Sequence, residues 1–243
     1  MSGQLQLFES RDVAQPWNVR VSRRARRLSV RVYPGGRVEV VVPPGASPVT
    51  VERFVGLHRR WIDDRVADLS ATGGVVESLR PQRIELPALG RSYSIDFHPD
   101  NKEARVTASS EGRLLISGPI KDEQRVARAL QRWLAGLAQV DMGRELVQTA
   151  RQCGLQFKRL QIRRQRTRWG SCSASGTISL NMCVLFQEVA VMRYLLIHEL
   201  SHTQHMNHSR RFWSLVESLE PEYRRLDREL LRGWQRVPAW VFG

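Results

Sequence analysis

Residues 189–202 read VAVMRYLLIHELSH, and this stretch is the most informative part of the sequence for the fold. Its apolar residues lie on most sides of a helix rather than along one stripe, which is typical of a helix that runs through a hydrophobic core. The same stretch contains His198, Glu199 and His202, whose polar groups are costly to bury unless they are paired or coordinated. The sequence therefore predicts a buried helix whose polar side chains have a function.

The last five residues of this stretch, His198 to His202, form an HExxH motif. Residues four apart lie on one face of a helix, so both imidazoles can reach one metal ion at roughly 2.0–2.1 Å. Glu199 projects about 100° away from His198, which puts its carboxylate beside the ion rather than on it. The spacing predicts His198 and His202 as zinc ligands and Glu199 as the general base for a metal-activated water.

Two further histidines follow the motif, His205 and His208. On a continuous helix His205 would lie about 10 Å along the axis from His198 and could not share its ion. The chain must therefore reverse, and Asn207 is predicted to allow this by adopting the left-handed conformation that ends helices. The reversal returns His208 toward the metal. Three histidines with one open position are typical of a catalytic zinc site, so His208 is the predicted third ligand.

An alternative third ligand is a carboxylate from the segment that follows. Glu217, Glu220 and Glu222 are available, but they lie among arginines, which favours a solvated helix face. Ser209 is predicted to cap the next helix, because its hydroxyl can accept a hydrogen bond from a free backbone N–H. The predicted core positions of that helix are Phe212, Leu215, Val216 and Leu219.

Other short motifs accompany the histidines. RWGSC stands at residues 168–172, a predicted strand passes through Asn181, and NHS at 207–209 is followed by Phe212-Trp213. Together with the HExxH motif, these residues resemble the YgjP-like metallopeptidase family, which is related to the SprT-like and WLM-type zinc peptidases. A weaker similarity extends to residues 27–38 and to Trp61-Ile62, so the resemblance covers most of the chain. It implies a compact zincin-like catalytic core in which His198, His202 and His208 bind zinc and Glu199 is catalytic.

The N-terminal part of the chain predicts a small sheet and a helix. Apolar residues alternate with polar ones over 28–42 on both sides of Pro34-Gly35-Gly36, which indicates an antiparallel hairpin. Ser47 followed by Pro48 is a helix start, and apolar residues then keep helical spacing as far as Leu69. This helix is expected to pack one stripe against the hairpin.

A polar stretch over 70–82, with Gly73-Gly74 and Pro81, is the predicted linker. We therefore expect an N-terminal hairpin and helix region over 1–80 and a zincin-like metallopeptidase region over 81–243.

Three strand-like runs over 84–117 predict a meander at the start of the second region. A long helix is predicted from Asp122 to about Gln152, where Gly154 provides a stop. A turn at Ser175-Gly176 predicts a hairpin before the buried helix. The expected class is α+β.

Arginine dominates the charge of the chain. There are 38 Lys and Arg residues against 24 Asp and Glu, which gives a formal net charge of +14. Such a field attracts polyanions, and the stretches 20–31 and 157–168 contain no acidic residue. An alternative function is therefore nucleic-acid binding with a structural zinc site, or a peptidase recruited to nucleic acid. Glu199 favours the peptidase, because a structural site has no use for it.

The sequence lacks a basic segment followed by an apolar stretch at its N-terminus and has no run of eighteen apolar residues. Its three cysteines form no CxxC pair, which argues against a disulfide framework. We expect a cytoplasmic protein with no membrane partner.

The predicted function is a zinc metallopeptidase that hydrolyses a protein or peptide substrate. Arg168, Asn181 and Tyr223 are equal candidates for stabilising the oxyanion. The hairpin around Trp169 either pairs with an extended substrate as an added strand or is a core hairpin with a packed tryptophan.

Overall fold

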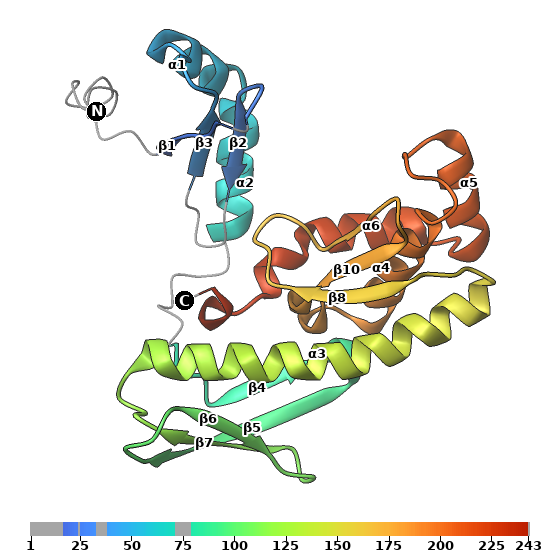
Figure 1. Cartoon of the computed structure of the whole chain (residues 1–243). Helices are drawn as coiled ribbons and strands as arrows, with labels where there is room; N and C mark the ends of the chain where they lie inside the picture. Colours follow the sequence, from blue (N-terminus) through green and yellow to red (C-terminus); the bar gives the residue numbers. More distant parts are fainter. Residues whose placement is uncertain (1–16, 24, 33–37, 71–78, 243) are drawn as a thin grey trace. The chain divides into compact units, whose positions relative to one another are not determined.

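The computed structural model of the chain describes residues 17–23, 25–32, 38–70 and 79–242 (Figure 1). Internal contacts divide the chain into two compact units, Met1–Gly74 and Val75–Gly243. Both units mix helices with sheets, so the predicted α+β class is confirmed. The expected turn at Pro34-Gly35-Gly36 and residues 71–78 of the expected linker lie outside the described residues, and the boundary at residue 80 stays a prediction.

The sheet of the first unit contains β1 (Trp17–Val21), β2 (Ser29–Val32) and β3 (Val38–Val42) in the order β1-β3-β2. β2 and β3 are antiparallel, which confirms the predicted strand pairing. β1 lies on the other side of β3 and runs parallel to it. This pairing was not predicted, because it joins segments about twenty residues apart and leaves no local pattern.

Two helices cover this sheet where one was predicted. α1 (Pro48–Leu57) begins as expected, because the Ser47 hydroxyl accepts a hydrogen bond from the Thr50 N–H at 3.3 Å. α1 ends at its C-terminal cap, His58, and a second helix, α2 (Arg59–Ser70), follows. The His58 N–H is shared between the carbonyls of Phe54, at 3.3 Å, and Val55, at 3.1 Å, which tightens the last turn of α1.

The apolar faces of α1 and α2 form the core of the first unit together with β3. Its members are all aliphatic and almost fully buried: Val38, Val40, Val42, Val51, Val55 and Ile62. The predicted packing of the helical stripe against the hairpin is therefore confirmed.

The second unit starts with a four-stranded sheet made of β4 (Arg83–Leu86), β5 (Arg91–Pro99), β6 (Arg105–Ala108) and β7 (Arg113–Gly118). The order is β4-β5-β7-β6, and β5 is parallel to β7. The predicted meander is wrong, since a meander would place β6 beside β5. Instead β6 and β7 form a hairpin whose turn contains Gly112 at φ +70°, and the second strand of that hairpin pairs with β5.

α3 (Glu123–Cys153) lies across this sheet (Figure 1). Asp122 caps its start by accepting from the Arg125 N–H at 3.0 Å, and Gly154 ends it at φ +65°, so the predicted long helix is confirmed. Other faces of α3 contact β8 and α4. α3 therefore connects the four-stranded sheet to the rest of the unit.

The remaining sheet contains β8 (Arg159–Arg163), β9 (Gly170–Cys172) and β10 (Thr177–Asn181) in the order β8-β10-β9. β9 and β10 are antiparallel, which confirms the predicted hairpin, and β8 is an unpredicted parallel neighbour of β10. Three helices follow: α4 (Val189–Ser201), α5 (Arg210–Leu219) and α6 (Tyr223–Arg232). α4 contacts α3, α5, α6 and β9 and is buried along most of its length, as predicted.

Short 3-10 helices connect several elements of this unit: η2 (Pro87–Leu89), η3 (Met182–Phe186), η4 (Gly233–Arg236) and η5 (Ala239–Val241). The last two belong to a C-terminal segment that packs on the β8–β9 connection. Trp234 stacks on Trp169 with ring centroids 4.0 Å apart. Arg164 donates to the carbonyl of Val241 at 3.2 Å, and Arg166 donates to the carbonyl of Phe242 at 2.7 Å.

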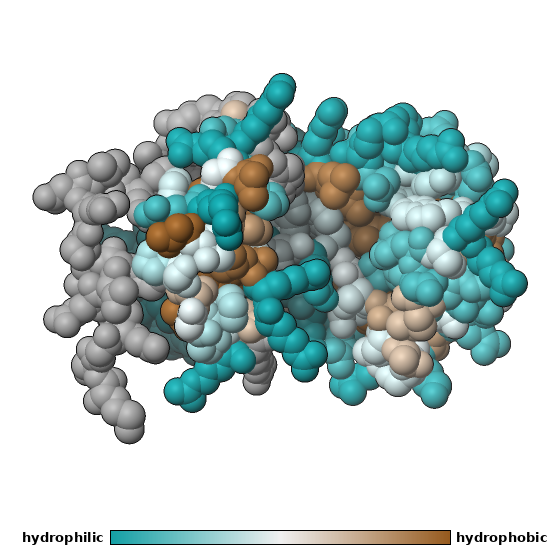
Figure 2. Space-filling model, turned by 90° about the horizontal axis from the view of Figure 1, so that it is seen from above, coloured by the Kyte–Doolittle hydropathy of each residue, from teal (hydrophilic) through white to brown (hydrophobic). Residues whose placement is uncertain are grey.

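Among the described residues that are visible in Figure 2, most of the surface is hydrophilic, and apolar residues form smaller patches. Among the described residues, no helix is both long enough and apolar enough to cross a membrane.

Candidate metal centre

Three histidines converge at the C-terminal end of α4. His198 lies on the last turn of the helix, His202 is its C-terminal cap, and His208 follows in the loop before α5. One ring nitrogen from each lies within 4.8 Å of the others, and the Nε2 atoms of His198 and His208 are 3.1 Å apart. Tetrahedral zinc ligands at about 2.0–2.1 Å are roughly 3.3 Å from one another. The spacing of this histidine cluster therefore fits a single ion, and His205 is not part of it.

The chain reverses after α4 without a left-handed residue. The N–H groups of Thr203, Gln204 and His205 bond back to carbonyls of Leu200 and Ser201. No residue other than glycine has a positive φ in the described part of the chain, so the predicted left-handed Asn207 is wrong. Successive turns spread the reversal over several residues, and no single residue has to leave the ordinary regions of φ and ψ.

Ser209 ends the loop and caps α5 as predicted, since its hydroxyl accepts from the Phe212 N–H at 3.5 Å. Phe212 and Val216 are fully buried. α5 is thereby fixed to the core directly after His208.

Each histidine of the cluster is held by a different contact. His202 Nδ1 lies 3.0 Å from the backbone carbonyl of His205. His198 Nδ1 lies 3.3 Å from the hydroxyl of Tyr194. The exposed ring of His208 stacks on Trp213 at 5.5 Å between centroids, with 23° between the planes. In all three cases the contact leaves Nε2 available, as outer contacts of metal-binding histidines commonly do.

Burial keeps two of these imidazoles neutral. Burial and the neighbouring His202 and His208 lower the pKa of His198 to about 3. Burial is also the main reason that the pKa of His202 is lowered. A neutral imidazole has a free lone pair, which a metal ligand requires.

Glu199 is the buried carboxyl beside the cluster, with 4% of its surface exposed. Its Oε2 has no hydrogen-bond partner among the described residues. Burial raises the pKa of Glu199 to about 8, and Arg168 opposes this by its positive charge. Such a group is costly in a protein interior unless a cation or water compensates it. The orphaned oxygen and the neutral imidazoles therefore fit the zinc ion that the sequence implies.

Gly170 of β9 is a site residue that the sequence analysis did not single out. A Cβ atom at this position would lie 2.4 Å from Oε1 of Glu199 and 2.8 Å from its Cγ and Cδ atoms. Only glycine therefore allows β9 to approach α4 this closely. Its place within the RWGSC motif was the available signal.

The structure separates the three candidates for oxyanion stabilisation. The Asn181 side chain is occupied, because it donates to the carbonyls of Gln165 and Arg168 and accepts from the Cys183 N–H. Asn181 therefore holds the β8–β9 connection, and its selection as a candidate is not supported. Arg168 is exposed, and its positive charge lowers the pKa of Glu199 against the effect of burial.

Tyr223 begins α6 and, like His208, stacks on Trp213. Its ring stacks on Trp213 at 5.4 Å, and its hydroxyl accepts from Arg224 Nε at 3.1 Å. Arg168 and Tyr223 both remain candidates.

The acidic residues considered as alternative ligands lie elsewhere. Glu217 pairs with Arg224 at 3.5 Å, and Glu222 pairs with Arg225. Neither they nor Glu220 belong to the histidine cluster. The predicted solvated helix face is confirmed for Glu217 and Glu222.

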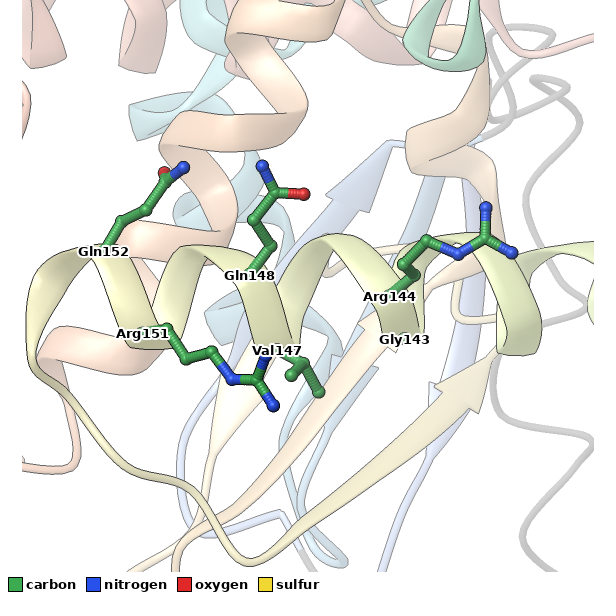
Figure 3. A pocket seen from close by; sticks show the side chains of 6 residues that line it. All are labelled: Gly143, Arg144, Val147, Gln148, Arg151 and Gln152. Carbon is green, nitrogen blue, oxygen red and sulfur yellow. The ribbon is translucent and has the colours of Figure 1, made fainter.

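A separate hollow runs along the exposed side of α3 (Figure 3). Its lining consists of Gly143, Arg144, Val147, Gln148, Arg151 and Gln152. This lining offers guanidinium and amide groups and contains no imidazole or carboxylate.

Comparison with known proteins identifies the family of the chain. The family model of the YgjP-like metallopeptidase domain matches residues 26–232. The chain belongs to the YgjP-like metallopeptidase family. Among solved structures, this YgjP-like chain is similar to the metallopeptidase zymogen of Pyrococcus abyssi abylysin. The identity is 30%, with 40% of this chain and 98% of that chain covered and a TM-score of 0.36. A search of curated proteins found no match.

Proposed function

We propose that this chain is a zinc-dependent peptidase with His198, His202 and His208 as metal ligands and Glu199 as general base. One observation supports the proposal above all others: three imidazole nitrogens converge beside a buried carboxyl with an unpartnered oxygen. A set of three imidazoles suits zinc, and three protein ligands leave one position open, as catalytic zinc sites require. We further propose that α4 and the sheet β8-β10-β9 form a zincin-like core.

When bound, zinc would supply the Lewis acidity that makes water a nucleophile at neutral pH. Glu199 would take the proton of the attacking water and pass it to the leaving amine. Burial of Glu199 suits this double role, because a raised pKa makes a carboxyl both a stronger base and an acid near neutral pH. Arg168 or Tyr223 would stabilise the oxyanion.

β9 provides a place for an extended substrate. It has β10 on one side, and no described strand pairs with its other side. Gly170 brings this edge strand into contact with Glu199. A peptide added as a further strand would therefore present its scissile bond beside the general base.

The decisive experiment compares zinc-loaded protein with its Glu199→Gln variant on a diverse peptide library. Glutamine is nearly isosteric but cannot accept the proton, so we expect zinc content and melting temperature to persist while cleavage falls by at least about 100-fold. Retained cleavage in the variant would refute the catalytic role. Collapse of the fold would indicate a structural role for Glu199 instead.

A further inference from the structure

A hydrogen-bonded chain connects α6 to the histidine cluster through a buried tyrosine. Tyr194 lies one turn before His198 on α4 and is fully buried. Its hydroxyl donates to Oδ1 of Asp227 on α6 at 2.8 Å and lies 3.3 Å from Nδ1 of His198. The spacing Tyr194-x-x-x-His198 places both side chains on one face of the helix. Asp227 reaches Tyr194 from 33 positions along the chain.

The direction of the first hydrogen bond determines the second. A tyrosine hydroxyl has one proton, and here that proton points to the Asp227 carboxylate. The hydroxyl oxygen can then only accept from His198, so the His198 proton must be on Nδ1. A neutral imidazole protonated on Nδ1 has its lone pair on Nε2, the atom that faces His208.

The opposite tautomer would harm the cluster. With its proton on Nε2, His198 could donate directly to Nε2 of His208, only 3.1 Å away. Nε2 of His198 would then carry a proton instead of a lone pair, and the lone pair of His208 Nε2 would accept that proton, so neither atom could bind an ion. Selection of the Nδ1–H tautomer thus keeps two ligand atoms free.

We propose that Tyr194 and Asp227 are positioning residues that hold His198 in its Nδ1–H tautomer and thereby favour metal binding. The proposal rests on the proposed function in so far as His198 is a ligand. Tyr194 acts through its hydroxyl on the imidazole, and Asp227 acts by orienting that hydroxyl. Neither is expected to touch substrate.

Tyr194 and Asp227 are expected to act on His198 in different ways. Tyr194→Phe removes the acceptor for the Nδ1 proton but keeps the ring. Asp227→Ala keeps the hydroxyl but releases its proton, which can then turn toward Nδ1 and favour the wrong tautomer. Both variants should therefore lose zinc affinity, although only one of them loses a contact to His198.

The primary test is the zinc dissociation constant, measured by competition with a chromogenic chelator. We expect it to rise about 10- to 100-fold in Tyr194→Phe and in Asp227→Ala, the range found for outer-shell partners of metal-binding histidines. Ser201→Ala is the matched control, because it also removes a buried hydroxyl from α4, one that donates to the carbonyl of Ile197. The zinc affinity of Ser201→Ala should equal that of the unaltered protein. Unaltered affinity in both test variants would overturn the proposal, as would an equal loss in the control.

A second readout does not depend on zinc or on the folding of a variant. Long-range proton–nitrogen NMR correlations of the unaltered, metal-free protein identify which nitrogen of His198 carries the proton. Protonation at Nδ1 is expected, and protonation at Nε2 would overturn the proposal. If the unaltered protein binds no zinc at all, the proposed function fails independently of this spectrum.

Discussion

At the residue scale, the ionisable groups of the metal-free site respond to pH in opposite directions. The pKa of Glu199 is raised by burial to about 8, so the folded protein keeps a proton that the unfolded chain has already lost. The stabilisation that this retained proton gives the folded state is fully present at pH values below the ordinary carboxyl pKa. It is lost as the pH rises toward 8. The pKa of His198 is lowered to about 3, so this residue affects stability only below about pH 6.5.

Between pH 6.5 and 8 we therefore expect metal-free protein to lose stability as pH rises, by roughly 2 kcal/mol, because one proton is released on unfolding. The Glu199→Gln variant has no carboxyl proton at this position, so its free energy of unfolding should change little with pH over this range. Urea unfolding at several pH values in the presence of a chelator measures both. Parallel profiles for the two proteins would contradict the burial of an uncharged Glu199.

Ligand substitutions test the metal centre directly. His198→Ala, His202→Ala and His208→Ala should each fall from about one zinc per chain to far less, because each removes one of three ligands. His205→Ala should keep its zinc, since His205 contributes only a backbone carbonyl to the site. Elemental analysis after gel filtration gives the stoichiometry. Zinc loss in His205→Ala with retention in His208→Ala would show that the ligand set is wrong.

Single residues differed in how readily the sequence identified them. The histidine cluster could be predicted, because helical spacing and one chain reversal determine which imidazoles meet. Tyr194 could also have been found from its position four residues before His198. Asp227 could not, and the RWGSC motif marks Gly170 without revealing its close approach to Glu199, since both contacts depend on how distant segments pack.

At the scale of elements, the contact between β9 and α4 depends on the absence of a side chain. Gly170→Ala would put a methyl group 2.4 Å from Oε1 of Glu199, so we expect a loss of roughly 1–3 kcal/mol in unfolding free energy and a large loss of peptidase activity. Thermal unfolding and peptide cleavage measure the two effects.

Gly136→Ala provides the control for this substitution. Gly136 lies on α3, and a Cβ there meets no atom within 4 Å, so alanine should be neutral or slightly stabilising. A double variant, Gly170→Ala with Glu199→Ala, should recover part of the stability lost by Gly170→Ala. Strictly additive losses would show that the two residues do not meet.

Elements with strong local signals were predicted well, and the strand order was not. Ser47, Asp122 and Ser209 mark helix starts through capping hydrogen bonds that depend on nearby residues only. The parallel pairs β1–β3, β5–β7 and β8–β10 join separated segments. Alternation of apolar residues is the same in either direction, so the sequence could not distinguish these pairs from a meander.

At the scale of the whole molecule, the net charge of +14 remains to be explained. Exposed basic residues occur throughout the stretch 157–168, but Arg164 and Arg166 already hold the C-terminal segment. We expect weak binding to DNA or RNA at low salt, with little sequence preference and a steep decline as salt rises, because arginines displace counterions from phosphates. Fluorescence anisotropy across a salt series measures it.

Variants show whether this stretch is responsible. Lys158, Arg159 and Arg163 are exposed and do not hold the C-terminal segment, so changing all three to serine should weaken binding and reduce its salt dependence. An equal charge change at Lys121, Arg125 and Arg128 is the control. Equal effects of both triple variants would mean that only total charge matters, and no binding at low salt would remove nucleic acid as a partner.

The contact between Gly170 and Glu199 also constrains how this lineage can evolve. While the glutamate is present, every amino-acid replacement at Gly170 meets the same obstacle, so selection for catalysis and selection for folding act on one site together. A descendant that gave up hydrolysis and replaced Glu199 by a smaller residue would be released from both. We expect substitutions at the two positions to appear together in such inactive branches, the glutamate first and the glycine afterwards. In a set of related genomes, that order would mark the sequences that have become pseudoenzymes.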